Sequence, residues 1–323
     1  MGVNLKDIIN SDPISFSDLK GKVIAVDALN SLYQFLASIR QQDGTPLMDS
    51  KRHVTSHLSG ILYRTIRLLE LGIKPVYVFD GKPPHLKGRE IAERSEAKEA
   101  AHYEWIKAKE DGRIEDAKKY AMRTSRLTSE MLRESKDLLK YMGMPCIQAP
   151  SEGEAQCVRI CTNGDAWAVG SQDYDSLLLG SPRLVRGMTM SGTIELSMIT
   201  LEKALLELDL TREQLVDLAI LVGTDFNDGI KGIGPKKALK AVKEGKMAEL
   251  RGQVDGYDEI KEIFMDPDVT DEYGIEWGKP DRGAAIALLC KEHEFSEDRV
   301  NNAFNNLEKY MKEFSQKDLS AWF

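Results

Sequence analysis

Seven acidic residues occur where an α/β fold would gather its loops on one side. They are Asp27, Asp80, Glu152, Glu154, Asp173, Asp175 and Asp225. Asp27 directly follows the apolar residues 23–26, and Asp80 directly follows residues 76–79. Like charges brought together raise each other's pKa, so such a cluster favours hard divalent cations bound by oxygen ligands. The pattern predicts a metal-dependent site that cleaves phosphodiester bonds.

Short apolar runs indicate the strands that would position these carboxylates. We expect strands at about 22–28, 74–80, 145–149 and 166–172, with weaker signals near 184–188 and 193–197. Continuous apolar runs are typical of buried parallel strands, and ligands bind beyond the carboxyl ends of such strands. Helical patterns lie at 29–41, 54–72, 200–222, 283–291 and 296–314, whereas 252–283 reads as irregular. The sequence therefore predicts an α/β fold with a central, mostly parallel sheet flanked by helices.

A long, highly charged helical segment at 89–142 separates two of the expected strands and breaks at Asp111 and Gly112. Because it is poor in large apolar residues, we expect it to leave the sheet as an insertion. Lys87, Arg94 and Lys98 are spaced seven and four apart, so they share one helical face. That face suits a polyanion, and equally a solvated helix pair held by salt bridges.

A glycine-rich turn at 229–234 precedes a helix that begins at Pro235 and continues with Lys236 and Lys237. Proline at the first helical position is favourable, and free N–H groups at a helix start attract phosphate. We interpret the segment as a hairpin of the helix-hairpin-helix type that binds the DNA backbone. An ordinary tight turn is the alternative.

Two short patterns have simpler structural explanations. Ser151 and Glu154 have the spacing of a capping box, so Glu154 has a possible role in satisfying backbone N–H groups alone. His53 and His57 are four apart, as metal ligands on a helix can be, but the glutamate of a zinc-protease motif is absent. We therefore do not expect a histidine metal site there.

The last eight residues, 316–323, combine a polar stretch with two large aromatic side chains. Leu319, Trp322 and Phe323 share one face of a helical turn. They would bury roughly 300–500 Å² in a partner's pocket, with a modest net affinity after ordering of the tail. The alternative is a tail that folds back on its own domain.

Composition gives a consistent setting. The net charge is −8, yet residues 82–140 hold 15 Lys and Arg against 12 Asp and Glu, so a polyanionic substrate is not excluded. No apolar run is long enough to span a membrane, and the start lacks a signal-peptide core. Four cysteines without a paired motif fit buried apolar positions in a reducing compartment. We expect a soluble, intracellular protein.

Five sequence blocks, in order, resemble the archaeal and eukaryotic flap endonuclease family of structure-specific 5′ nucleases. The blocks cover residues 26–28, 78–84, 149–155, 171–175 and 223–226, and the hairpin and tail follow them. The tail is similar to the family's clamp-binding box, and the lack of a basic extension after it resembles archaeal members. The resemblance implies a PIN-like 5′ nuclease fold with a helical arch and a helix-hairpin-helix element.

The resemblance also implies roles for individual residues. Two Mg²⁺ ions, for which Mn²⁺ would substitute, are expected at the seven carboxylates, with Glu154, Asp80 and Asp27 toward one ion and Asp173, Asp175 and Asp225 toward the other. Lys87 and Arg94 match the basic catalytic pair. The implied DNA contacts are Gly2, Tyr33, Arg123, Arg126, Gly232, Gly234, Lys236 and Lys237. The implied clamp contacts are Gln316, Leu319, Trp322 and Phe323. A K⁺ ion is implied at the hairpin, although Gly229 stands where many members have a hydroxyl ligand.

These expectations together describe one nuclease domain, 1–315, and a clamp-binding tail, 316–323. Within the domain we expect an N-terminal nuclease region at 1–98, the arch at 82–135, an internal nuclease region at 140–225 and the hairpin region at 225–260. The expected partners are flap DNA and a PCNA-type sliding clamp, with no membrane and a monomeric state. The expected location is the cytoplasm or nucleoid of an archaeon, or the nucleus of a eukaryote.

Two other functions remain open from the sequence. A PIN-like single-strand ribonuclease would share the sheet and the acidic cluster, but it would need neither the long arch nor the hairpin. A clamp-bound DNA scaffold with a vestigial acidic cluster would need no cations, although the presence of all seven carboxylates argues against it.

Overall fold

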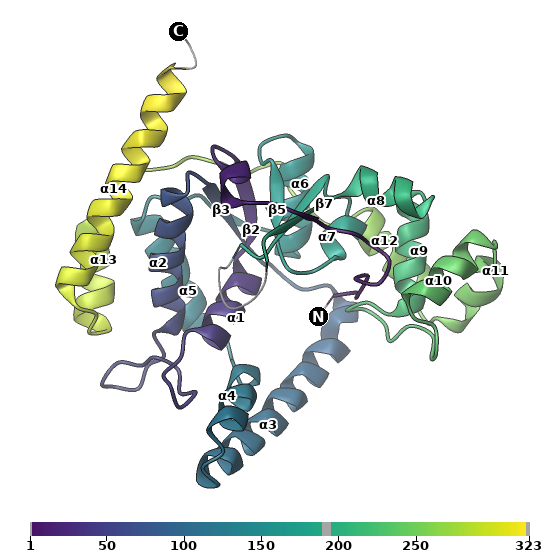
Figure 1. The fold of residues 1–323 in the computed structure, drawn as a ribbon, viewed down its shortest axis with the longest axis horizontal. Coiled ribbons are helices and arrows are strands. Elements are labelled where there is room, and N and C mark those ends of the chain that lie inside the picture. Colours follow the sequence, from purple (N-terminus) through teal and green to yellow (C-terminus); the bar gives the residue numbers. More distant parts are fainter. Residues whose placement is uncertain (1, 189–194, 321–323) are drawn as a thin grey trace.

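The computed structural model describes residues 2–188 and 195–320, without the side chains of 89–95, 114, 117, 118 and 314–320. A twisted sheet lies at the centre, helices cover both of its faces, and one helical pair extends away from the body (Figure 1). None of the helices in this described part is long and apolar enough to cross a membrane.

The sheet has seven strands in the order β1-β7-β6-β5-β2-β3-β4. Their bounds are β1 Asp12–Pro13, β2 Val23–Asp27, β3 Lys74–Phe79, β4 Cys146–Gln148, β5 Ala168–Gly170, β6 Arg183–Arg186 and β7 Ser197–Thr200. Strands β2 to β6 are parallel to one another, whereas β7 pairs antiparallel with β6, and β1 pairs antiparallel with β7 at the edge. The expected mostly parallel sheet is confirmed. The sequence missed β1, because its two residues carry no apolar signal.

The strand order reverses at β2, which places three functional strand ends side by side. Chain connections run from β2 to β3 and β4 on one side, and β5 and β6 lie on the other. In open α/β sheets, ligands bind in the crevice at such a switch point. The carboxyl ends of β5, β2 and β3 therefore meet at one edge. Four of the seven acidic residues lie at these ends or just after them.

Helices on the two faces bury two separate hydrophobic cores. Strand β3 contributes to both, because Val76 and Val78 face one core while Tyr77 and Phe79 face the other. One face is covered by α1 Ala28–Ser38, α2 Ser56–Glu70, α5 Ser129–Tyr141, α13 Arg282–Ile286 and α14 Glu297–Ser320. The other is covered by α6 Gly153–Thr162, α7 Asp175–Leu178, α8 Leu201–Leu208, α9 Arg212–Val222, α10 Pro235–Lys243, α11 Met247–Leu250 and α12 Tyr257–Met265.

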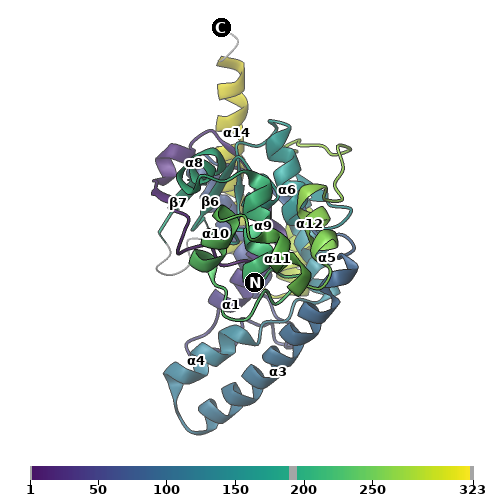
Figure 2. The ribbon, with the colours of Figure 1, turned by 90° about the vertical axis from the view of Figure 1, so that its right-hand side faces the viewer.

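The charged insertion begins with a short 3₁₀ turn, His85–Lys87, and continues as α3 Gly88–Glu110 and α4 Ile114–Arg123. Helices α3 and α4 pair and project from the body (Figure 2). The expected break falls in the loop between them, where Gly112 has φ 71°. The last part of 89–142 does not project: α5 packs on α2 and buries Leu138 and Leu139. Its apolar residues are few but lie on one face.

Residues 252–283 are less irregular than expected. A 3₁₀ turn at Arg251–Gln253 is followed by α12, which buries Tyr257, Ile260 and Phe264. These three residues have helical spacing, but flanking glycines and acidic residues hide the signal. After α13 the chain forms a π-helix, Ala287–Glu292, before α14, and an early 3₁₀ turn spans Phe16–Leu19.

The packing of α1 against α2 holds the end of β2 in place and leaves no space at Gly60. A Cβ atom added there would lie 2.3 Å from Cγ of Phe35, which is itself buried. We expect Gly60→Ala to lower the free energy of unfolding by about 1–3 kcal/mol, because overpacking forces the ring or the helices apart. Urea denaturation followed by circular dichroism measures the change.

Gly252→Ala is the matched control, since nothing lies within 4 Å of a Cβ atom at that position. We expect that variant to stay within about 0.5 kcal/mol of the parent protein. Equal denaturation midpoints for the two variants would contradict the proposed tight contact between α1 and α2.

Candidate active site

One cavity of about 910 Å³ is lined by all seven acidic residues predicted from the sequence. Asp27 ends β2, Asp80 follows β3, and Asp173 follows β5. The others lie at helix ends: Glu152 and Glu154 at the start of α6, Asp175 at the start of α7, and Asp225 after α9. The cavity therefore lies at the switch point of the sheet, where residues far apart in the sequence converge.

Burial and mutual repulsion disfavour full ionisation of this cluster. Burial, together with the charges of Asp80 and Asp173, raises the pKa of Asp27 to about 7. Burial and the charge of Asp225 raise the pKa of Asp175 to about 7 as well. Burial followed by three neighbouring aspartates raises the pKa of Glu154 well above its ordinary value. The carboxylates alone cannot all be charged at neutral pH.

The set of donor atoms fits hard divalent cations. Seven carboxylates offer oxygen ligands of the kind that Mg²⁺ and Mn²⁺ prefer. A cation would remove the cost that now appears as raised pKa values for Asp27, Asp80, Glu154 and Asp175. Chemistry and electrostatics therefore agree on the kind of ion that the residues can bind.

Backbone and side-chain donors fix the direction of several carboxylates. Asp80 accepts a hydrogen bond from the backbone N–H of Gly153 at 2.8 Å, in the first turn of α6. Asp175 accepts one from the backbone N–H of Val3 at 2.9 Å. Glu154 accepts hydrogen bonds from the backbone N–H and the hydroxyl of Ser176. Glu154 therefore does not cap α6, and the capping-box interpretation is wrong.

The N-terminal residues run past the cavity. A Cβ atom added at Gly2 would lie 2.5 Å from Oδ2 of Asp175. Val3 is buried, and its N–H is bonded to the same carboxylate. The start of the chain thus lies against the acidic cluster, as the resemblance implied for Gly2.

A positive side chain lies inside the cluster. Nζ of Lys87 donates a hydrogen bond to Glu152 and lies 3.6 Å from Oδ2 of Asp225. Burial alone would lower the pKa of Lys87, but the carboxylates of Glu152, Asp225 and Asp80 outweigh it and raise that pKa. The second expected basic residue, Arg94, lies on α3, and its side chain is outside the described part of the structure.

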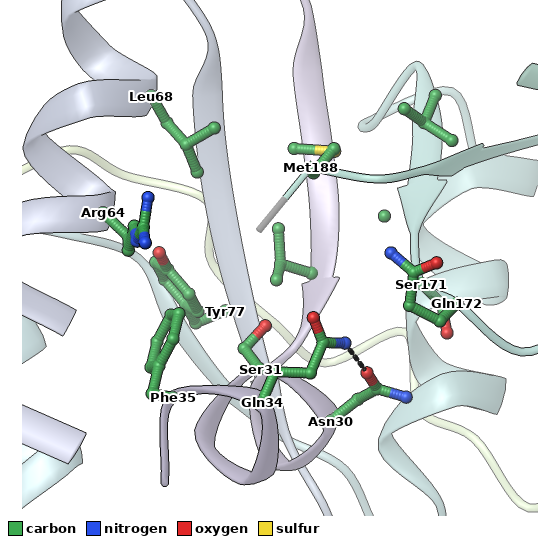
Figure 3. Close-up of a pocket in the computed structure, with 13 residues that line it drawn as sticks. Asn30, Ser31, Gln34, Phe35, Arg64, Leu68, Tyr77, Ser171, Gln172 and Met188 are labelled. Atoms are coloured by element: carbon green, nitrogen blue, oxygen red, sulfur yellow. Dashed lines mark hydrogen bonds between the residues drawn. The ribbon is translucent and has the colours of Figure 1, made fainter. Parts of the chain in front are cut away.

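Asn30 connects the acidic cluster to a small cavity behind it. Its Nδ2 donates to Oδ2 of Asp173 at 2.8 Å, and its Oδ1 accepts from Nε2 of Gln34. Figure 3 shows this pair facing Ser171 and Gln172 across the cavity. The sequence did not indicate Asn30, although its place three residues after Asp27, in the first turn of a helix, was an available signal.

Tyr33 on α1 and the arch residues named from the resemblance lie in different surroundings. Tyr33 and Arg123 line the large cavity, and Nζ of Lys98 lies 4.6 Å from the centre of the Tyr33 ring. Arg126 instead forms an exposed ion pair with Glu99 at 3.3 Å. The charged face of the insertion is therefore partly directed at the cavity and partly neutralised by its own salt bridges.

The glycine-rich hairpin leads directly from Asp225 into α10. Gly229 has φ 68°, and a Cβ atom there would lie 2.4 Å from the Val222 carbonyl, so a residue with a hydroxyl side chain does not fit. Nζ of Lys237 donates to the carbonyl oxygen of Gly232 at 2.8 Å. Lys236 is exposed, and Gly234 precedes the first turn of the helix.

The expected clamp-binding tail is largely outside the described residues. Helix α14 includes Gln316 and Leu319, whose side chains are not described, and Trp322 and Phe323 follow the last described residue.

The four cysteines are free, with Cys157 and Cys161 buried in α6 as expected. His53 precedes α2, whereas His57 lies within it. The prediction from the sequence that both histidines lie on one helix is therefore wrong.

Fold and site together define a nuclease of the XPG type. The XPG N-terminal domain profile matches residues 1–101, and the XPG I-region profile matches residues 143–225. The chain has a TM-score of 0.73 and 25% identity with the catalytic core of Rad2 in complex with a DNA substrate, over 95% of this chain and 100% of that one. Both matched regions carry carboxylates of the cavity.

The similarity to one branch of this class covers the whole chain. It is 51% identical to flap endonuclease 1 of Pyrococcus abyssi over 100% of this chain and 98% of that protein. It is 50% identical to flap endonuclease 1 of Methanothermobacter thermautotrophicus, with both chains fully covered. The structure of flap endonuclease-1 from Methanococcus jannaschii matches with a TM-score of 0.82 and 44% identity over 97% of this chain and 99% of that chain.

The chain belongs to the flap endonuclease 1 family, in its archaeal type. The resemblance drawn from the sequence is confirmed, as is the assignment to nucleases that hydrolyse phosphodiester bonds.

We expect the acidic cluster to make thermal stability depend on Mg²⁺ and pH together. Raised folded-state pKa values mean that the metal-free protein loses stability as pH rises from about 4 through about 7. Mg²⁺ binds the ionised form, so its stabilisation should be small at pH 5.5 and reach about 5–10 °C at pH 8 with Mg²⁺ near 100 Kd. Differential scanning calorimetry with and without Mg²⁺ measures it.

Asp27→Asn removes one of these groups while keeping an oxygen that can accept from the Asn30 N–H. In this variant the metal-free protein should lose less stability between the two pH values. A Mg²⁺-induced shift of the same size at pH 5.5 and pH 8 would contradict the electrostatic account.

Proposed function

We propose that this protein is a Mg²⁺-dependent 5′ flap endonuclease with 5′–3′ exonuclease activity. Its substrates would be branched DNA in replication, where Okazaki fragments are processed, and in repair. The observation that carries the proposal is the convergence of seven carboxylates and Lys87 in one cavity. The assignment of the substrate is supported by relatives named flap endonuclease 1, which are 51% and 50% identical to this chain.

Two Mg²⁺ ions would bind on opposite sides of the cluster. The carboxylates of Glu154, Asp80 and Asp27 would bind one ion, and those of Asp173, Asp175 and Asp225 the other. When bound, the ions supply an attacking water of lowered pKa and neutralise charge on the leaving oxygen. The donors that hold the carboxylates, such as Asn30 on Asp173 and Ser176 on Glu154, orient these ligands.

Lys87 would act as an electrostatic stabiliser of the phosphate under attack. Its ammonium lies among Glu152 and Asp225, and phosphate oxygens would draw it away from these partners. The 3₁₀ turn that carries it is the first element of the arch, so arch position and charge placement are linked. Arg94 follows Lys87 by seven residues and lies on α3. We propose it as the second cation of this pair.

The arch would select substrates with a free 5′ end. Helices α3 and α4 project beside the cavity, and Lys98, Arg123 and Tyr33 lie along its wall. Tyr33 offers a ring for base stacking, and the basic residues offer contacts for flap phosphates. Arg126 would contribute only after leaving Glu99.

The hairpin would bind the duplex backbone. Gly232 and Gly234 expose N–H groups ahead of α10, and Lys236 adds an exposed positive charge. A K⁺ ion at the hairpin carbonyls would have to displace Nζ of Lys237 from Gly232. The duplex would thus be held through phosphates without reading of its sequence.

The tail would recruit the enzyme to replication junctions. We propose that Gln316, Leu319, Trp322 and Phe323 bind a PCNA-type sliding clamp, which raises the local concentration of a monomeric nuclease. The proposed site of action is the nucleoid of an archaeal cell, in line with archaeal relatives.

Both alternative functions fit the structure less well. A ribonuclease for unstructured RNA has no use for a projecting helical pair and a lysine-tipped hairpin. A scaffold with a vestigial site would be free to lose buried carboxylates, because their repulsion opposes folding. Here the carboxylates of Asp80, Glu154 and Asp175 instead have dedicated hydrogen-bond donors.

Replacing one metal-binding carboxylate should separate cleavage from binding. We expect Asp173→Ala to lower the single-turnover rate on a 5′-flap DNA by at least about 10³-fold, equivalent to about 4 kcal/mol. Its affinity for the same DNA should change by less than about tenfold, because the hairpin and arch contacts remain. Rapid-quench kinetics and fluorescence anisotropy measure the two quantities.

Asp271→Ala provides a matched control, since it removes an exposed carboxylate paired with Arg159 on the surface. Its rate should equal that of the parent protein. Substantial residual cleavage by Asp173→Ala would refute the metal role, whereas faster cleavage of linear RNA than of flap DNA would favour the ribonuclease.

The hairpin can be tested through the salt dependence of DNA binding. Lys236→Ala combined with Lys237→Ala should flatten the slope of log affinity against log salt by about 1–2, since each lost phosphate contact removes about 0.9. Affinity should fall equally for unrelated duplex sequences. Binding isotherms between low and physiological salt supply the slope.

The control changes two lysines in the last turn of the same helix, Lys240→Ala with Lys243→Ala. It alters net charge equally, but its lysines lie at the far end of α10 and pair with Glu244 and Asp209. If both double variants changed the slope equally, the effect would come from overall charge and the hairpin assignment would fail.

A further inference from the structure

Five titratable side chains form a connected chain, and none of them lines the active-site cavity. His53 Nδ1 and His293 Nδ1 lie 2.9 Å and 3.2 Å from Oδ2 of Asp49. His293 Nε2 lies 3.2 Å from Oε1 of Glu134, and His57 Nε2 lies 3.1 Å from Oε2 of the same carboxylate. Apart from the half-exposed ring of His53, these side chains are buried.

Two turns and two helices supply the chain. Residues 49–53 form a tight turn before α2, which carries His57, while Glu134 lies on α5 and His293 on the turn before α14. Ser50 in the first turn bonds to Glu294 in the second through its N–H, at 2.8 Å, and its hydroxyl. Among described residues other than glycine, φ is positive at Arg52, Asp209 and Glu294, so two of these three strained positions flank the cluster.

Three rings and two carboxylates are in direct polar contact in this cluster. Both ring nitrogens of His293 face carboxylate oxygens, Nδ1 toward Asp49 and Nε2 toward Glu134. Nδ1 of His53 and Nδ1 of His293 both face the same oxygen of Asp49.

The same three atoms have nearly the spacing of ligands around one ion. Zinc bonds of about 2.0–2.1 Å in tetrahedral geometry place ligand atoms about 3.3 Å apart. The separations from Asp49 Oδ2, at 2.9 Å and 3.2 Å, are close to that value. All three candidate ligand atoms, from Asp49, His53 and His293, lie within 4.8 Å of one another, so only the two rings need to approach further.

The neighbouring residues form the outer shell that a metal-bound histidine usually has. Such a histidine donates its second N–H to a carboxylate, which orients the ring and increases its basicity. Glu134 occupies this place behind His293 and is itself held by Nε2 of His57. This outer shell is distinct from a surface salt bridge, since Glu134 and His57 are buried.

We propose that Asp49, His53 and His293 form a second metal site, for a borderline transition-metal ion such as Zn²⁺. Two imidazole nitrogens and one carboxylate oxygen suit Zn²⁺, whereas Mg²⁺ requires oxygen ligands. The side chain of His53 is 54% exposed, which provides an entry route and leaves a position for water. The ion would bind between Asp49 and the two rings and fasten the turn before α14 to the turn before α2.

The proposed ion would stabilise structure and take no part in cleavage. Helix α14 packs on α2, and the His293 turn is the connection that leads into it. Fastening this turn would restrain the helix whose end carries the clamp-binding tail. The site would therefore contribute to the attachment of the C-terminal helix, independently of Mg²⁺ in the active site.

Zinc binding to the full-length protein tests the proposal. The chelator-treated protein is titrated with Zn²⁺ by equilibrium dialysis in excess Mg²⁺, which occupies the carboxylate cluster. We expect one tightly bound Zn²⁺ per chain and a higher melting temperature. His53→Ala should lose this equivalent and the thermal shift, and Co²⁺ should give the visible bands of a four-coordinate ion only with the parent protein.

Two further variants make the result specific. His85→Ala removes an exposed histidine outside the cluster and should retain the Zn²⁺ equivalent. Glu134→Gln should weaken Zn²⁺ binding by about 10–100-fold while retaining the stoichiometry, as expected for an outer-shell partner. Circular dichroism verifies that each variant is folded. Equal Zn²⁺ binding by the parent protein and His53→Ala, or no binding by either in excess Mg²⁺, would overturn the proposal.

Discussion

Repulsion among seven carboxylates in one cavity is the constraint on which the rest of the structure depends. Burial raises the pKa values of Asp27, Asp80, Glu154 and Asp175, so the cluster opposes folding unless something compensates. Lys87 supplies part of that compensation from within the protein. Cations would supply the rest. The same ions would thus both relieve the repulsion among the carboxylates and provide the chemistry of cleavage.

A stiff scaffold is needed to hold like charges together, and the sheet provides it. Strands β5, β2 and β3 are parallel neighbours, and each is packed on both faces by a separate hydrophobic core. The carboxyl ends of these strands cannot separate without breaking that packing. The elements proposed to bind DNA, namely the pair of α3 and α4 and the hairpin, follow the cavity residues Lys87 and Asp225 in the chain. They are therefore adjacent to the rigid sheet but structurally separate from it.

The sequence revealed the strand ends more clearly than it revealed contacts. Asp27 and Asp80 were predictable because apolar runs define their strands, and the strand order then brings them together. The role of Glu154 was ambiguous, since only the fold shows that Ser176, distant in sequence, supplies its donors. Helix α12 was missed because its three buried residues lie among charged neighbours. The position of Asn30 in the first helical turn after Asp27 was visible in the sequence, but its bond to Asp173 required coordinates.

The donor atoms of the two proposed metal sites imply that the protein sorts ions by chemistry. The candidate metal ligands at the active-site cavity are carboxylates, so hard ions are favoured there, whereas the cluster of Asp49, His53 and His293 offers two imidazole nitrogens. Zn²⁺ binds to either kind of ligand, but millimolar Mg²⁺ competes only for oxygen. A protein with both sites would therefore keep a structural Zn²⁺ while Mg²⁺ occupies the catalytic centre, which needs exchangeable water ligands. The half-exposed His53 is decisive in this respect, because without it the remaining Asp49 and His293 would form only an ordinary buried hydrogen-bonded pair.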